Sequence, residues 1–210
     1  FMVVSLKSMM ENASKDFNYN IHILHTEISH EMKNVLYNME NENFKVYFNN
    51  VSEYLKVIKD SIPIRDYYTP TTYYRMFIAE MFPEYNKAIY IDSDTVVLGD
   101  ISELYNKDLG SAYLGAANEQ VMIQEDIYGT YVEKVLGINR EDFFNAGVLL
   151  INCHMFRTDK VLEEFIKLTL KYNFVVTQDE DYLNVICRGN VLWIEQQWNT
   201  EIFGTIDYED

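Results

Sequence analysis

Cysteine, proline and glycine are all scarce in this chain of 210 residues. The two cysteines, Cys153 and Cys187, are too few for a disulfide framework, and neither has the spacing of a zinc site. The three prolines and eight glycines form no Pro-rich or Ser/Gly-rich stretch, so no linker or internal repeat is visible. The sequence therefore predicts one domain in a reducing, cytoplasmic setting.

Positive charge is also scarce, since 17 Lys and Arg face 33 Asp and Glu, for a net charge of −16. This balance argues against nucleic acids and anionic membranes as partners, because both are bound through basic patches. No run approaches the ~20 apolar residues of a membrane span, and residues 1–13 lack the basic start and cleavage site of a signal peptide. Any membrane association would have to come from segments outside these residues.

What the chain has is regular hydrophobic patterning, with 48% hydrophobic residues. Short apolar or alternating runs predict strands at 21–24, 44–48, 88–91, 112–116, 148–151 and 191–194. Helical spacing predicts a helix over 70–81, with Thr69 as its cap, and another over 160–173, capped by Thr158 or Asp159. Strands that alternate with helices predict an α/β fold with a mostly parallel sheet flanked by helices.

The strand at 88–91 is followed by two carboxylates, Asp92 and Asp94, with no Lys or Arg among residues 88–98. In an extended segment these side chains point the same way, so both can reach one ion. Unpaired carboxylates against an apolar strand are costly unless a cation meets them, and Mg²⁺ or Mn²⁺ prefers oxygen ligands shared with phosphate. A solvated loop is the plain alternative, because 33 acidic residues make this spacing common and 179–181 repeats it.

Three more segments carry polar residues in unusual places. The sequence 145–147, Asn-Ala-Gly, leads directly into the strand at 148–151, which suits close approach of backbone and amide to a ligand, although an ordinary turn also fits. Gln178 and three acids, 179–181, open a predicted helix; helix capping explains one or two of these acids better than three. Arg75 lies in the predicted helix at 70–81 and is either a surface residue or a partner for phosphate or carboxylate.

Taken in order, these segments resemble the retaining family 8 glycosyltransferases, the group of lipopolysaccharide galactosyl- and glucosyltransferases and glycogenin. The matching segments are Tyr73-Tyr74-Arg75, Tyr90-Ile91-Asp92-Ser93-Asp94, Phe144-Asn145-Ala146-Gly147-Val148, Gln178-Asp179-Glu180-Asp181 and Trp198-Asn199. Four motifs in the same order over nearly the whole chain, ending in Trp198-Asn199, are far more specific than Asp-x-Asp alone.

The resemblance implies a single domain of the GT-A nucleotide-sugar-binding type over residues 1–210. It implies transfer of galactose or glucose from a UDP-sugar to a glycan, lipid-linked sugar or protein, with Asp92 and Asp94 binding Mn²⁺ (or Mg²⁺) at the diphosphate. It assigns Asp179 and Glu180 to catalysis. The residues it assigns to substrate binding are Arg75, Ser93, Asn145, Ala146, Asp179 and Asp181.

Glu180 departs from several relatives, which have an amide at this position. A carboxylate there either attacks the anomeric carbon to form a covalent glycosyl-enzyme or only stabilises an oxocarbenium-like centre during front-face attack by the acceptor. We favour the second hypothesis, because the relatives with an amide function without a carboxylate.

A second departure concerns the metal. The family completes the metal shell with a C-terminal histidine, and its leading strand carries residues that bind uridine. The four histidines here, His22, His25, His30 and His154, all lie elsewhere. We therefore expect the domain to be incomplete, without the first strand and the C-terminal metal-ligand segment.

Two alternatives compete with the transferase hypothesis. A haloacid-dehalogenase-type phosphatase would use Asp92 as nucleophile and Asp94 as general acid, but it leaves residues 145–147 unexplained. A non-catalytic domain that binds a sugar nucleotide is the other alternative.

Overall fold

The computed structural model describes residues 1–58, 70–174 and 176–201. Within them the strands are β1 (Tyr19–His25), β2 (Phe44–Asn50), β3 (Ala88–Ile91), β4 (Leu114–Ala116), β5 (Val148–Ile151) and β6 (Val191–Trp193). The α-helices are α1 (Met2–Asn12), α2 (His30–Tyr37), α3 (Ser52–Ile58), α4 (Ile78–Met81), α5 (Ile101–Tyr105), α6 (Gln120–Gln124), α7 (Asp126–Tyr131), α8 (Cys153–Thr158), α9 (Val161–Lys171) and α10 (Asp179–Cys187). The other helical segments are η1 (Pro70–Phe77), η2 (Val132–Leu136), η3 (Arg140–Asp142) and η4 (Gln196–Trp198).

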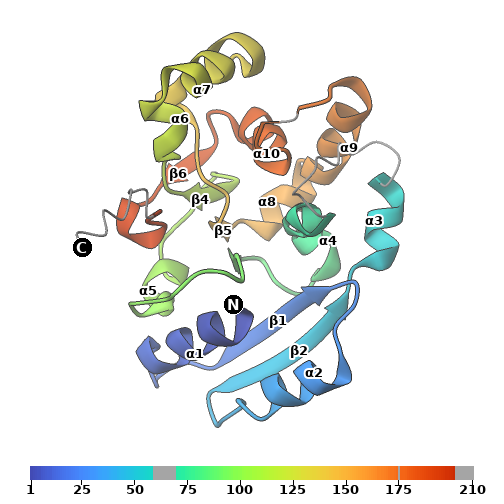
Figure 1. Cartoon of the computed structure of the whole chain (residues 1–210), viewed down its shortest axis with the longest axis vertical. Helices are drawn as coiled ribbons and strands as arrows, with labels where there is room; N and C mark the ends of the chain where they lie inside the picture. The colour runs from blue at the N-terminus through green and yellow to red at the C-terminus, as the bar shows by residue number, and fades with distance from the viewer. Residues whose placement is uncertain (59–69, 175, 202–210) are drawn as a thin grey trace, which may run out of the picture.

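The strands form two sheets in the part of the chain that the structure describes (Figure 1). In the two-stranded sheet β1 and β2 run parallel, and the four-stranded sheet has the order β3-β5-β4-β6. The expectation of a mostly parallel sheet was wrong for this second sheet, because β5 runs antiparallel to both β3 and β4, and only β4 and β6 are parallel. The reversal matters for the site, because it places the start of β5 beside the end of β3.

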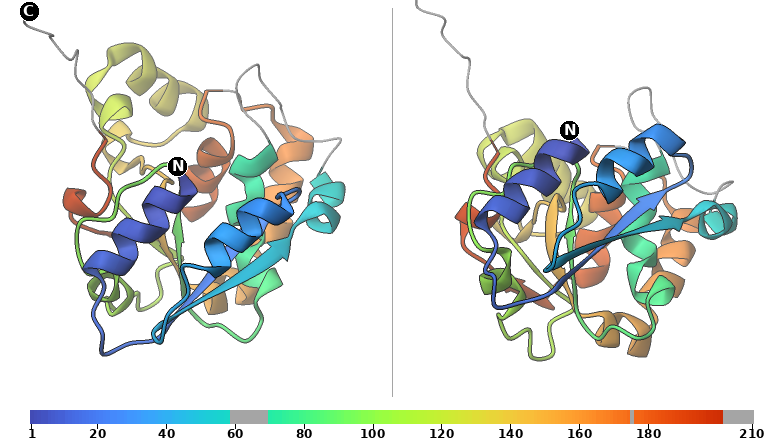
Figure 2. Two further views of the ribbon diagram at one scale, coloured as in Figure 1. Left: turned by 60° about the horizontal axis from the view of Figure 1, so that its bottom comes forward. Right: turned by 90° about the horizontal axis from the view of Figure 1, so that it is seen from below.

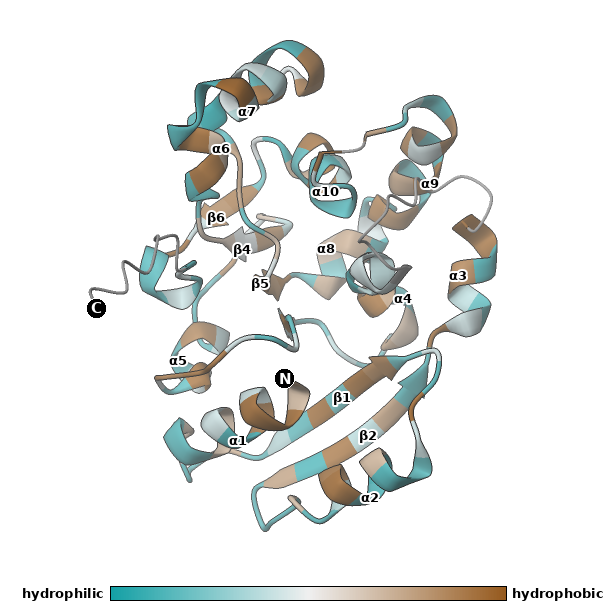
Figure 3. Cartoon of the chain, viewed as in Figure 1, coloured by the Kyte–Doolittle hydropathy of each residue, from teal (hydrophilic) through white to brown (hydrophobic). Residues whose placement is uncertain are grey.

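Strand β5 lies between two hydrophobic layers. Its side chains alternate, so Leu149 and Ile151 join the core with Phe156, Phe165 and Tyr182, which come from α8, α9 and α10. Its other face, Val148 and Leu150, joins a second core with residues of α1 and α5. A strand covered on both faces is apolar throughout, as the colour of β5 in Figure 3 illustrates.

The N-terminal sheet has its own helical cover. Helices α1 and α2 lie over one face of β1 and β2 (Figure 2), where Leu6, Leu36 and Val46 form a buried cluster. Ser29 starts α2, and its side chain accepts a hydrogen bond from the Met32 N–H. No helix among the described residues is long and apolar enough to cross a bilayer.

The predicted helices differ from the structure mainly at their ends. The segment 70–81 is a 3₁₀ helix, η1, followed by the single turn α4, and its expected cap Thr69 lies outside the described residues. Helix α9 follows Lys160, which has a positive φ of 55°, so neither Thr158 nor Asp159 caps it. Most of the segment 1–13, which lacks the features of a signal peptide, forms helix α1.

Candidate active site

Asp92 is placed by the pairing of β3 with β5. The ladder ends with Ile91 opposite Val148, and one residue further the Asp92 N–H donates to the Gly147 carbonyl at 2.8 Å. The antiparallel register thus joins two segments that are 55 positions apart in the chain and that both carried polar residues of interest.

Arg75 is the centre of the site. Its side chain is only 6% exposed, and its Nε lies 2.9 Å from Asp179 Oδ2 and 3.0 Å from the Thr72 carbonyl oxygen. Nη2 lies 3.2 Å from Asp92 Oδ1, and Nη1 donates to the Ala146 carbonyl. A buried guanidinium with five fixed donors can hold three chain segments in one arrangement.

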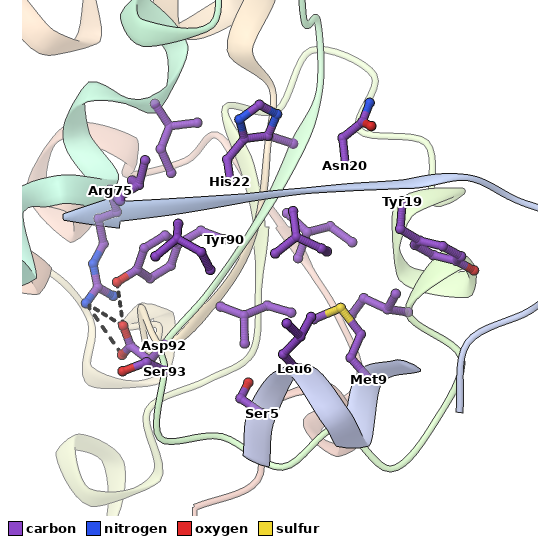
Figure 4. A pocket seen from close by; sticks show the side chains of 18 of the residues that line it. Ser5, Leu6, Met9, Tyr19, Asn20, His22, Arg75, Tyr90, Asp92 and Ser93 are labelled. Carbon is purple, nitrogen blue, oxygen red and sulfur yellow. Dashed lines mark hydrogen bonds and ion pairs between the residues drawn. The ribbon is translucent and has the colours of Figure 1, made fainter. Parts of the chain in front are cut away.

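Tyr90 supports this ion pair from β3 (Figure 4). Its hydroxyl donates to Asp92 Oδ1 at 2.5 Å, and its ring lies under the Arg75 guanidinium, 4.5 Å from the ring centre. Burial, together with the Asp92 charge, raises the pKa of Tyr90 above its ordinary value, so the hydroxyl stays a donor. Tyr90 belongs to the matching segment of the sequence but was given no role, although it stands two residues before Asp92 and so on the same side of the strand.

The turn from Asn145 to Gly147 approaches its neighbours too closely for a larger residue. A Cβ on Gly147 would lie 3.0 Å from Asn145 Oδ1 and 3.4 Å from Asp92 Oδ2. Asn145 donates from Nδ2 to Glu119 and Glu201, and its Oδ1 accepts from the Gly147 N–H at 2.7 Å. Glu119 and Glu201 are further residues that sequence reasoning did not place here.

Helix α10 carries Asp179, which pairs with Arg75, and Glu180, which contacts the turn at Ala146. Glu180 Oε2 accepts from the Ala146 N–H at 2.7 Å, and desolvation and the Glu119 charge raise its pKa well above the ordinary value. Burial raises the pKa of Asp179 to about 6, although the Arg75 charge acts in the opposite direction. These two acids therefore hold protons more tightly than exposed carboxyls do.

Asp181 does not join this group. It is fully buried and accepts from the Thr177 N–H at 3.2 Å, the Thr177 hydroxyl at 2.8 Å and the Tyr131 hydroxyl at 2.8 Å. Its carboxylate is thus engaged by the segment before α10 and by α7.

Ser93 and Asp94 are exposed in the loop after β3. No group of three or more His, Cys, Asp or Glu side chains suited to a metal ion occurs among residues 1–58, 70–174 and 176–201. Two aspartates fit a hard ion that takes its remaining oxygen ligands from phosphate and water. They are too few for a site in which the protein supplies all the ligands.

A cavity of about 700 Å³ lies beside the site, between α1, β1, β3 and α5 (Figure 4). Its walls are mainly apolar, with Leu6, Met9 and Ile89 among them, and Arg75 and Asp92 lie at one end. Strands β1 and β3 both line this cavity, so its apolar interior adjoins the charged side chains of Arg75 and Asp92.

Comparison with known proteins identifies this arrangement. The family model for glycosyl transferase family 8 matches residues 1–209. A Haemophilus influenzae protein named as a glycosyltransferase is 32% identical over 201 residues, which are 95% of this chain and 59% of that protein. The lipopolysaccharide 1,2-glucosyltransferase of Escherichia coli is 25% identical over 142 residues, covering 66% of this chain and 41% of that enzyme.

Solved structures agree with the sequence matches. The galactosyltransferase LgtC in complex with donor and acceptor sugar analogues superposes with a TM-score of 0.79 and 26% identity, over 93% of this chain and 69% of LgtC. The apo structure of the bifunctional glycosyltransferase WbbM gives a TM-score of 0.80 and 27% identity, over 93% of this chain and 36% of WbbM. The expected GT-A type α/β fold is confirmed, and the phosphatase alternative loses its basis. Because the family model spans nearly the whole chain, this protein belongs to glycosyl transferase family 8.

Proposed function

We propose that this chain transfers galactose or glucose from a UDP-sugar to a hydroxyl group of a glycan, lipid-linked sugar or protein, with retention at the anomeric carbon. The observation that carries the proposal is the buried Arg75 guanidinium, held between Asp92, Asp179 and the Ala146 carbonyl. It sets a cation and the buried Asp179 carboxyl beside the Asp92–Asp94 loop. The glucosyltransferase name of the E. coli relative and the sugar analogues bound to LgtC support this choice of substrates.

In this proposal Asp92 and Asp94 bind Mn²⁺ or Mg²⁺ together with the donor diphosphate. Asp92 Oδ1 already accepts from Tyr90 and lies nearest Arg75, so Oδ2 is the oxygen less engaged by the protein. When bound, the ion stabilises the negative charge that develops on the UDP leaving group. The protein itself contributes the orientation of Asp92, through Tyr90 and Arg75.

On the donor side, Arg75 meets phosphate or sugar oxygens and Asp179 accepts hydrogen bonds from sugar hydroxyls. Glu180 stabilises positive charge near the anomeric carbon or hydrogen-bonds there, while the acceptor attacks from the front face. Its raised pKa favours the hydrogen-bonding role, because a neutral carboxyl is a poor nucleophile and carries no charge to offset the developing cation. A covalent glycosyl adduct, trapped by mass spectrometry and lost in Glu180→Gln, would overturn it.

The proposal is tested by measuring UDP release from UDP-glucose and UDP-galactose by the full-length protein, with and without Mn²⁺. The variants are Asp94→Ala and, as a matched control, Asp16→Ala, which removes an exposed aspartate remote from the site. Metal-dependent turnover that Asp94→Ala abolishes and Asp16→Ala keeps is the expected result.

The non-catalytic alternative predicts a different pattern, in which UDP binds in the presence of Mn²⁺ but no donor is turned over. Absence of both turnover and Mn²⁺-dependent UDP binding would contradict the proposed function. The full-length protein is needed because the chain spans only 59% of the H. influenzae relative.

A further inference from the structure

The loop 92–97, which carries Asp94, is hydrogen-bonded to the rest of the protein on both sides of that residue. On one side the Asp92 N–H donates to the Gly147 carbonyl at 2.8 Å. On the other side Thr95 and Val97 are hydrogen-bonded to helix α1. Asp94 itself is exposed, so its position depends on how the loop is held rather than on burial of its own side chain.

Helix α1 contacts this loop through three polar side chains, Ser5, Ser8 and Asn12. They are three and four positions apart, which places them on one side of the helix. Serine and asparagine are weak helix formers, because their side chains compete for backbone hydrogen bonds. Ser5 is nevertheless only 6% exposed. Helix formation and hydrophobic packing therefore do not explain this polar row, whereas its contacts with the loop do.

Val97 is held by α1 through both of its peptide groups. Its N–H donates to Ser8 Oγ at 2.9 Å, and its carbonyl accepts from Asn12 Nδ2 at 3.0 Å. The Ser8 hydroxyl donates its own hydrogen to the Ser5 carbonyl at 2.9 Å, which orients the oxygen that accepts from Val97. Asn12 Nδ2 also donates to the Ser8 carbonyl at 2.9 Å, so both of its hydrogens are used. These bonds fix the far end of the loop.

Thr95 connects α1 to the backbone of Asp92. Thr95 Oγ1 donates to the Asp92 carbonyl at 2.9 Å and lies 3.1 Å from Ser5 Oγ. Ser5 is at the end of α1 that faces Asp92 (Figure 4). A threonine hydroxyl has one hydrogen, and a carbonyl can only accept, so Ser5 must be the donor to Thr95. The hydrogen bonds thus run in one direction, from Ser5 through Thr95 to Asp92, and each polarises the next.

We propose that Ser5, Ser8 and Thr95 are positioning residues, which hold the loop 92–97 in the conformation that lets Asp92 and Asp94 bind one metal ion. The inference rests on the proposed function and deepens it, because it gives helix α1 a part in metal binding. The three residues act through the main chain of the loop. Such support matters at a site with two protein ligands, since their separation must suit an ion that also binds phosphate.

The test is a double-mutant cycle on the hydrogen bond between Ser5 and Thr95. Ser5→Ala removes the donor, and Thr95→Val removes the hydroxyl while it keeps the shape of the side chain. The readout is binding of UDP to the full-length protein with and without Mn²⁺, measured by calorimetric titration beside the melting temperature. Ser111→Ala, which changes an exposed serine in the turn before β4, is the matched control.

We expect Ser5→Ala and Thr95→Val each to weaken Mn²⁺-dependent UDP binding by about 10-fold, the lower end of the usual effect of residues that support metal ligands. The double variant should bind no more weakly than the weaker single variant, because Ser5 acts through Thr95. Binding without Mn²⁺ should stay unchanged. Losses that multiply in the double variant, or that are equal with and without Mn²⁺ and follow the melting temperature, would overturn the proposal.

A second readout does not depend on the proposed function. Backbone amide resonances of Asp94 and Thr95, recorded by NMR without metal or nucleotide, should shift in Ser5→Ala and Ser8→Ala but not in Ser111→Ala. The Val97 amide should exchange its hydrogen faster in Ser8→Ala, which removes its acceptor. These changes support the positioning of the loop even where the wild type binds no UDP and the proposed function fails. Unchanged resonances and exchange in the folded variants would contradict the proposal.

Discussion

Tyr90 contacts both members of the Arg75–Asp92 ion pair, and it does so with two different parts of its side chain. The hydroxyl donates to Asp92, and the ring supports the guanidinium. Each contact can be removed separately, because Tyr90→Phe deletes only the hydroxyl whereas Tyr90→Leu deletes both.

We expect Tyr90→Phe to weaken Mn²⁺-dependent UDP binding by about 10- to 100-fold, the usual effect of removing a hydrogen-bond partner from a metal ligand. Tyr90→Leu should also lower the melting temperature further, since the cation–π contact contributes about 0.5–2 kcal/mol. Calorimetric titration of UDP with and without Mn²⁺ measures the first effect. Tyr128→Phe, on the exposed side of α7, is the matched control, and an equal loss in that variant would refute a specific role for Tyr90.

A glycine is required at position 147 because neighbouring side chains lie very close to its backbone. In Gly147→Ala the new methyl group would lie 3.0 Å from Asn145 Oδ1 and 3.6 Å from Asn199 Nδ2, so the turn must shift. We expect a loss of about 1–3 kcal/mol in the free energy of unfolding, together with loss of turnover. Chemical denaturation of this variant beside Gly99→Ala, where a Cβ meets nothing within 4 Å, isolates the steric cause. Equal stability of the two variants would contradict it.

Asn184 attaches helix α10 to the segment before β5 through two hydrogen bonds. Asn184 is 2% exposed, its Oδ1 accepts from the Phe144 N–H at 2.8 Å, and its Nδ2 donates to the Phe144 carbonyl at 2.9 Å. It thus satisfies the peptide groups of Phe144 as a neighbouring strand would. This attachment fixes the distance between Glu180 on α10 and the turn that begins one residue later.

Asn184→Ala leaves one buried donor and one buried acceptor without partners, and we expect a cost of about 2–4 kcal/mol in the free energy of unfolding. Urea denaturation measures it. Asn34→Ala on the exposed side of α2 should change the stability by less than about 0.5 kcal/mol. A cost for Asn184→Ala as small as that of the control would show that α10 is held in place by other contacts.

At the level of elements, local patterns predicted where strands and helices lie but not how they are arranged. The boundaries of β3 and β5 agree with the apolar runs at 88–91 and 148–151. Strand β5 is buried on both faces and β3 is partly buried, and such strands are short continuous apolar segments. The direction of β5 was not predictable, since it depends on pairing with strands more than 30 positions away. The 3₁₀ form of η1 was not predictable either. Arg75 in η1 contacts three other segments of the chain, and local sequence patterns do not reveal such contacts.

The candidate site likewise contains residues that the sequence motifs indicated and residues that they did not. Asp92, Arg75, Ala146, Asp179 and Glu180 meet in the structure, as the order of motifs indicated. Asp181 does not, because successive residues of a helix point about 100° apart and three consecutive acids cannot share one target. No role was predicted for Tyr90 or Glu119, because a tyrosine in a strand and a glutamate after one have ordinary structural explanations.

At the scale of the whole molecule, several buried or partly buried carboxyls among the described residues hold their protons more tightly in the fold than out of it. Burial raises the pKa of Asp179 to about 6 and that of Glu201 to about 7, and the pKa of Glu180 is raised as well. The native state therefore binds protons that the unfolded chain, with carboxyl pKa values of about 4, releases. The stabilising effect is complete below the unfolded pKa and is lost as the pH rises through the folded values.

We accordingly expect the melting temperature to fall as the pH rises from about 5 to about 7.5, and to change little above that range. Scanning calorimetry across this range measures it, and Glu201→Gln should flatten the upper part of the curve. The net charge of −16 contributes in the same direction, but added salt screens that repulsion and leaves buried groups largely unaffected. A slope that salt abolishes completely would contradict the buried origin.

The central position of β5 has a consequence for how the protein loses its site. Both edges of β5 are hydrogen-bonded, to β3 and β4, and both faces are buried, so it belongs to the part of the fold that opens last. The turn at Ala146 and Gly147 continues directly into it. Ligand binding should consequently persist to the midpoint of global denaturation and disappear with it, without an earlier phase in which the site melts alone.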